Sequence, residues 1–143
     1  STDRPDGFHT LDLLLAEGRK LNLVATDDAH FTEPDFFGGW VMVKAQQNKP
    51  DSILESLKEG SFYSSQGPEF VDIEINSETA KVQSTPVSTV IVQGQGSAYV
   101  AQHGEAVVSA ELSLERLKNS PWLRVTVIDQ YGKRAWSNPI WRD

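Results

Sequence analysis

The stretch Phe70-Val71-Asp72-Ile73-Glu74-Ile75 alternates apolar and polar side chains with a period of two. This alternation is typical of a strand with one buried and one exposed face. Turn signals such as Thr85-Pro86, Gly94-Gln95-Gly96 and His103-Gly104-Glu105 separate similar segments farther along the chain. We expect those strands at residues 62–64, 80–83, 87–92, 97–102, 106–111, 123–129 and 135–141, with one helical turn at 114–118. Short strands at this spacing predict an antiparallel, immunoglobulin-like β-sandwich over residues 62–143.

Residues 1–61 have a different pattern, in which predicted helices and strands are mixed. After a polar lead-in over residues 1–7, apolar residues at three- and four-residue spacing predict a helix over residues 8–20. Short apolar runs predict a buried strand at 21–25 and a second strand at 40–45. Pro50 and Gly60 mark the start and end of a second helix. These elements form an α/β segment with too few strands for a sheet of its own, and residues 64–66 are expected to be a plain linker to the β-sandwich.

The composition excludes several classes of protein. The 143 residues carry a net charge of −7, so we expect no binding to nucleic acid or to an anionic membrane through a basic patch. No run approaches the roughly 20 apolar residues of a membrane span. The chain has no cysteine, which removes disulfides and thiolate chemistry. It begins without a Met, which suggests a processed chain, a proteolytic product or a cloned piece of something longer.

Carboxylates and an imidazole follow the predicted strand at 21–25. Asp28 and His30 are two positions apart, and on an extended backbone their side chains would leave the same face. A carboxylate and an imidazole at the end of a strand form a plausible pair of metal ligands. The alternative from these residues alone is a surface turn capped by aspartates.

Several stretches together resemble the C-terminal part of the polymerase-and-histidinol-phosphatase (PHP) family of metal-dependent hydrolases. The resembling stretches are Leu11–Lys20, Ala25–Phe31, Gly39–Val43, Ser52–Glu69 and Val127–Ile140. The resemblance implies that Asp28 and His30 are metal ligands and that residues 1–61 are the remnant of a distorted β/α barrel. It further implies hydrolysis of a phosphoester by a water bound to divalent metal ions such as Zn, Mn or Fe.

The chain departs from the family because the other metal ligands of the barrel are missing. His9 and His103 have no ligand spacing to Asp28 or His30, and two protein ligands are fewer than the roughly three of an open catalytic zinc site. We therefore expect an inactive C-terminal piece, which binds no metal tightly and pairs with the missing barrel portion or with a second copy. Asp27 and Asp35 either orient His30 from outside the metal shell or cap turns.

A non-enzymatic function is the alternative. In that interpretation the β-sandwich binds a partner, and the α/β segment is a degenerate remnant. Trp122 and Trp136 lie in apolar strand settings, so we expect them to pack in a core rather than to bind sugars.

Overall fold

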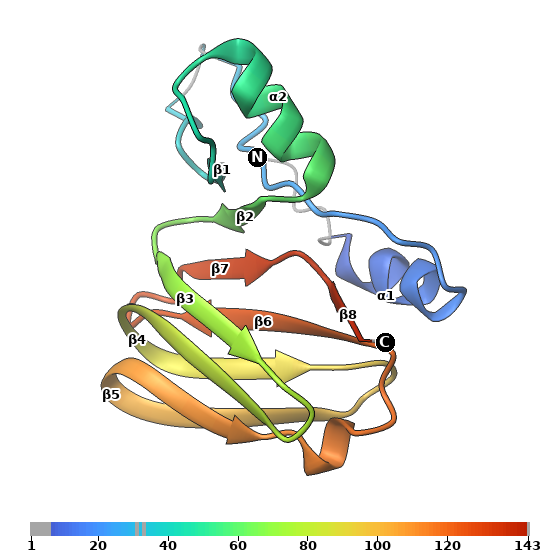
Figure 1. Cartoon of the computed structure of the whole chain (residues 1–143). Helices are drawn as coiled ribbons and strands as arrows, with labels where there is room; N and C mark the ends of the chain where they lie inside the picture. The colour runs from blue at the N-terminus through green and yellow to red at the C-terminus, as the bar shows by residue number, and fades with distance from the viewer. Residues whose placement is uncertain (1–6, 31, 33, 143) are drawn as a thin grey trace.

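The computed structural model describes residues 7–30, 32 and 34–142, so all of the predicted lead-in over residues 1–7 except Gly7 lies outside the described residues. The chain is mostly β, and α2 and the edge strand β1 lie above the rest of its curled sheet (Figure 1). The elements follow the order α1 (Phe8–Ala16), β1 (Trp40–Val43), α2 (Pro50–Glu59), β2 (Phe62–Ser65), β3 (Phe70–Ile75), β4 (Thr79–Gln93), β5 (Tyr99–Ser113), the 3-10 helix η1 (Glu115–Leu117), β6 (Trp122–Ile128), β7 (Arg134–Ser137) and β8 (Ile140–Trp141).

All the strand pairs of the described chain are antiparallel. The main path of the sheet runs β1-β2-β7-β6-β4-β3, with β5 added to β4 and β8 added to β6. Strand β4 pairs with β5 along most of its length, while β3 pairs with its first half and β6 with its second half. The long strand therefore joins two groups of strands, which is why the sheet curls.

Two predicted turns were wrong, because both lie inside long strands. Thr85-Pro86 lies within β4, and His103-Gly104-Glu105 lies within β5. The register of the β4–β5 pair shifts between Gln83 and Val87 and again between Val87 and Thr89. Pro86 has no N–H for the ladder, and these irregularities accommodate it without ending the strand. The helical turn predicted at 114–118 is confirmed by η1.

The core lies between the strands of the curled sheet. Most of its large, fully buried side chains come from β4, η1 and β6, and Leu114 precedes η1. These residues are Val82, Val87, Val90, Val92, Leu114, Leu117, Trp122, Leu123, Val125 and Val127. The prediction that Trp122 packs in the core is confirmed, whereas Trp136 is only half-buried.

Helix α2 is confirmed with the predicted ends. Pro50 occupies the first turn, and Gly60 follows the last turn with a left-handed φ of 76°. Helix α1 is shorter than predicted and ends at Ala16. Gly18, at φ 82°, turns the chain away two residues later. None of the helices among the described residues is long and apolar enough to cross a membrane.

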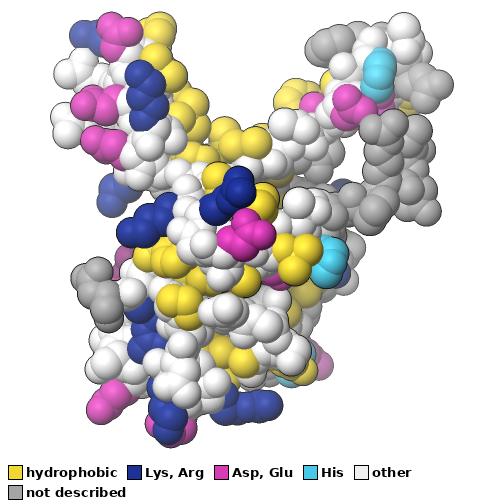
Figure 2. All heavy atoms as spheres, turned by 90° about the vertical axis from the view of Figure 1, so that its right-hand side faces the viewer, with side chains coloured by type: hydrophobic (Ala, Val, Ile, Leu, Met, Phe, Trp, Pro, Cys, Tyr) yellow, Lys and Arg dark blue, Asp and Glu magenta, His cyan; other side chains and the backbone are white. Residues whose placement is uncertain are grey.

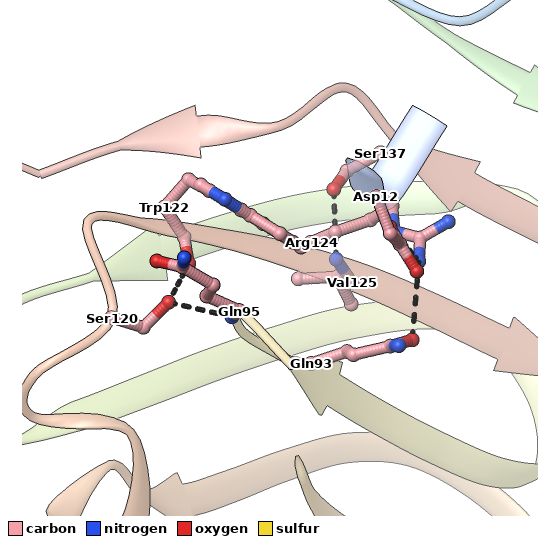
Figure 3. Close-up of polar contacts among 8 residues, drawn as sticks. All are labelled: Asp12, Gln93, Gln95, Ser120, Trp122, Arg124, Val125 and Ser137. Atoms are coloured by element: carbon pink, nitrogen blue, oxygen red, sulfur yellow. Dashed lines mark hydrogen bonds and ion pairs between the residues drawn. The ribbon is translucent and has the colours of Figure 1, made fainter. Parts of the chain in front are cut away.

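Helix α1 is fixed to the sheet through a buried arginine of β6. The Arg124 side chain is 3% exposed, and its guanidinium donates to the Asp12 carboxylate at 3.0 Å and to Gln93 Oε1 at 3.2 Å. The three side chains meet beside β6 in Figure 3. The Phe8 ring covers the same guanidinium, with 4.3 Å between Cζ and the ring centroid.

The prediction of a buried strand at 21–25 was wrong. Residues 21–25, which we call the extended segment, pair with no strand among the described residues. Leu21 and Val24 of this segment are 37% and 63% exposed. Side chains hold it in place of a ladder: Leu23 N donates to Asn138 Oδ1, and Ala25 N donates to Ser64 Oγ. An apolar run at this position is therefore not buried by the rest of the described chain.

The described part of residues 7–61 buries very little. Leu15 and Ser56 are its only buried side chains among the described residues. Six large hydrophobic side chains of this part are exposed; they come from α1, residues 21–24, residues 36–37 and α2, and we call this set the apolar face: Leu13, Leu21, Val24, Phe36, Phe37 and Leu54. In Figure 2 hydrophobic side chains line the hollow between two arms that project from the upper part of the molecule.

Candidate functional site

The candidate site is a loop that leaves the extended segment at Asp27 and returns at Phe37. We call it the acidic loop; its described residues are 27–30, 32 and 34–37. Phe37 N donates to Asp27 Oδ2 at 2.7 Å, which closes the base of the loop. The structure therefore uses the Asp27 carboxylate to hold the loop together.

His30 and Asp35 are paired within this loop. His30 Nδ1 lies 2.9 Å from Asp35 Oδ2, and the backbone N–H of His30 donates to Asp35 Oδ1 at 3.1 Å. The His30 side chain is 65% exposed and that of Asp35 is 22% exposed. With Nδ1 protonated and donating to Asp35, the Nε2 lone pair of His30 is available to a ligand.

This pairing changes the proton affinity of both groups. The hydrogen bond that His30 donates to the Asp35 carboxylate raises the pKa of His30, and the charges of Asp28 and Asp35 raise it further. The same hydrogen bond lowers the pKa of Asp35. The imidazolium is therefore favoured over a wider range of pH than in a free histidine.

Asp28 has an unusual backbone. Its φ is 53°, in the left-handed region that few non-glycine residues adopt, although aspartate is among those that tolerate it. The sequence analysis expected the side chains of Asp28 and His30 on the same face only if the backbone is extended. At Asp28 the backbone is not extended, so this condition is not met. The side chains of Asp28 and His30 are nevertheless both exposed, while Asp27 and Ala29 between and beside them are half-buried.

The donor set is incomplete for a metal centre. No group of three or more His, Cys, Asp or Glu side chains suited to a metal ion is present among the described residues. Asp28 and the free ring nitrogen of His30 offer two ligands, and Asp27 and Asp35 are engaged within the loop. His9 and His103 are exposed elsewhere, and His103 contacts Thr89 Oγ1 at 3.1 Å. The described residues therefore do not make up a metal site by themselves.

Two residues that position the loop were missed by the sequence analysis. Ser64, assigned there to a linker, is fully buried in β2, where its Oγ accepts from Ala25 N and donates to Leu23 O. Asn138 accepts from Leu23 N and donates to the carbonyls of Gly60 and Phe62. Ser64 and Asn138 lie in polar positions of strand-rich segments, which gave no sign that they bind a distant backbone.

The comparisons with known proteins identify no relative of the chain. No family model, no curated protein and no solved structure matches it.

Proposed function

We propose that this chain is the C-terminal part of a PHP-type metal-dependent hydrolase that acts on phosphoesters. In this proposal Asp28 and His30 are two of the ligands to a divalent Zn, Mn or Fe ion. The pairing of His30 Nδ1 with Asp35 Oδ2 at 2.9 Å carries the proposal. Metal-binding histidines commonly donate their second ring N–H to a carboxylate, which fixes the ring and its tautomer.

Asp35 and Asp27 take supporting roles in this proposal. Asp35 orients the imidazole so that Nε2 faces the metal, and Asp27 holds the loop closed through Phe37 N. A divalent metal would supply a bound water of lowered pKa and would stabilise charge on the phosphoryl oxygens. The remaining ligands would come from outside the chain, so the chain alone would be inactive.

The apolar face supports the proposal that more protein packs on residues 7–61. This segment has two buried side chains among its described residues and leaves six large hydrophobic side chains exposed, and apolar area left in water costs about 25 cal/mol per Å². We propose that residues 1–61 are the end of a β/α barrel and that the missing barrel portion, or failing that a second copy, covers this face. Residues 62–143 would then be an immunoglobulin-like β-sandwich attached to it.

A paramagnetic titration tests the ligand pair in this chain even if affinity is weak. Mn²⁺ broadens the NMR signals of protons close to it, so the ring protons of His30 should broaden at lower Mn²⁺ than those of His9 and His103. Asp28→Ala should abolish this difference. Asp72→Ala, which removes an exposed carboxylate of β3, should keep it. Equal broadening of all three histidines would contradict the proposal.

The intact protein provides the second test. It should hydrolyse 4-nitrophenyl phosphate with added Mn²⁺ or Zn²⁺, and Asp28→Ala and His30→Ala should lower both activity and metal content, whereas His103→Ala should change neither. An intact protein that purifies without metal and stays inactive would instead favour the non-catalytic binding module.

A further inference from the structure

A cavity lies between α1, the extended segment and the ends of β2 and β7. Its volume is about 720 Å³, which is within the range of small-molecule sites. Phe8 and Leu11 of α1 line it together with Val24 and Trp136. The apolar side chains on this wall would suit a flat, apolar group.

The walls of this cavity are fixed independently of one another. The Arg124–Asp12 pair holds α1, and Phe8 also packs on Trp136 with 5.5 Å between the ring centroids. Ser64 holds the extended segment at Ala25. Because each wall has its own attachment to the sheet, the cavity does not depend on a ligand to hold its walls apart.

The polar side of the cavity is suited to an anion. Arg134 and Gln66 line it, and Arg134 is exposed. Among the described residues, the Arg134 guanidinium has no hydrogen-bond or ion-pair partner. Gln66 Oε1 accepts from Arg134 N at 3.3 Å, which leaves the amide NH₂ of Gln66 to donate elsewhere. A guanidinium and an amide donor together suit a phosphate or carboxylate.

The cavity also adjoins the acidic loop along the chain. Thr26 and Gly38 line it, and they are the immediate neighbours of Asp27 and Phe37, which close the loop. Gly38 approaches Asp27 closely, since a Cβ at Gly38 would lie 3.4 Å from Asp27 Cβ. A ligand in the cavity would therefore lie beside the base of the loop that carries Asp28 and His30.

We propose that this cavity binds an aryl phosphate. The aromatic group packs against Trp136 and the apolar wall, and the phosphate accepts hydrogen bonds from Arg134 and Gln66. The choice of phosphate as the anion rests on the proposed function, whereas the cavity, its apolar wall and its cationic side do not. The inference assigns the substrate class of the proposed hydrolase to aromatic phosphoesters.

Calorimetric titration with 1-naphthyl phosphate in excess EDTA tests the inference without a metal. The chain should bind this compound saturably, and Arg134→Gln should weaken the affinity about tenfold, because a charged hydrogen-bond donor is lost. The matched variant Arg116→Gln removes an exposed cation on η1 and should leave the affinity unchanged. Neutral 1-naphthol should bind more weakly and should not respond to Arg134→Gln.

A second pair of variants tests the apolar wall. Val24→Glu places a negative charge in the cavity lining at a side chain that is 63% exposed, so the fold should tolerate it while affinity falls. Val71→Glu makes the same change on β3, where Val71 is 71% exposed, and should have no effect. Absence of saturable binding, or equal affinity of the Arg134→Gln and Arg116→Gln variants, would overturn the inference.

The inference and the proposed function fail in different ways. Asp28→Ala and His30→Ala should retain the binding of 1-naphthyl phosphate in EDTA. If that binding is absent while Mn²⁺ still selects His30, the cavity inference alone is wrong. If binding depends on Arg134 while Mn²⁺ does not select His30, the metal proposal alone is wrong.

Discussion

The guanidinium of Arg124 and the carboxylate of Asp12 lie 3.0 Å apart although 112 residues separate them in the chain. Arg124 is in the middle of β6, and Asp12 is on α1, so this ion pair joins the first helix to the β part of the molecule. The pair also supports the cavity, because α1 supplies Phe8 and Leu11 to its wall.

We predict that Asp12→Ala destabilises the protein by about 2 kcal/mol, since it removes a carboxylate that faces a buried guanidinium. This value is below that of a fully buried pair because the Asp12 side chain is 27% exposed. Urea unfolding measures it. Glu17→Ala is the control, because the Glu17–Arg19 pair is more than half exposed at both side chains and should contribute less than about 1 kcal/mol. Equal losses in the two variants would contradict the structural role of Arg124.

We predict that Asp35→Asn lowers the pKa of His30 toward that of a free histidine. The carboxylate of Asp35 is the main cause of the raised pKa of His30, and its charge also contributes. NMR titration of the histidine ring protons measures the change, with His103 as the internal reference. Because the raised pKa keeps the folded-state proton on His30 to higher pH, metal binding at Nε2 should strengthen as pH rises through that pKa. An unchanged His30 titration in Asp35→Asn would show that the two side chains are not paired.

We predict that Asn138→Ala costs about 3 kcal/mol in the free energy of unfolding. The variant leaves Leu23 N and the carbonyls of Gly60 and Phe62 without their side-chain partner. Thermal or urea unfolding measures the loss, and hydrogen exchange at the Leu23 amide should accelerate. Asn48→Ala, at an exposed loop position, should change stability by less than about 0.5 kcal/mol. If the Leu23 amide exchanges at the same rate in both variants, Asn138 does not hold the extended segment.

We predict that Gly60→Ala is more destabilising than Gly96→Ala. Both glycines have a left-handed φ, 76° and 73°, so both substitutions incur strain of about 1 kcal/mol. At Gly60 the new Cβ would also lie 2.8 Å from Asn22 Nδ2, whereas at Gly96 no heavy atom lies within 4 Å. The difference between the two unfolding free energies isolates this contact, and equal losses would mean that Asn22 moves away without cost.

We predict that Leu54→Glu leaves stability unchanged to within about 0.5 kcal/mol and lowers self-association of the chain. Leu54 is 51% exposed on α2 and belongs to the apolar face, which should drive association in the absence of a covering partner. Sedimentation velocity measures the association. Tyr131→Glu, at a side chain that is 80% exposed in a turn outside the apolar face, is the control. Identical sedimentation of the two variants would contradict the assignment of the apolar face as an interface.

Local patterns in the sequence were sufficient to predict much of the β part. The alternation in Phe70–Ile75 predicted β3 with its observed bounds, because side-chain direction in a strand depends only on the local backbone. Pro50 and Gly60 likewise predicted the ends of α2, since both act within a single turn of helix. For Asp35 the sequence left two roles open, a turn cap or a partner of His30, and the contact with His30 Nδ1 matches the second.

The tertiary structure alone decided the features that depend on distant neighbours. Thr85-Pro86 remains inside β4 because β5 pairs along the strand and the register shifts absorb the proline. The run at residues 21–25 remains unpaired, because its polar backbone is held by Ser64 and Asn138 instead of a neighbouring strand. Whether a carboxylate faces Arg124 likewise depends on where α1 docks. The sequence by itself thus determined which residues form most strands, while long-range contacts determined which of them meet.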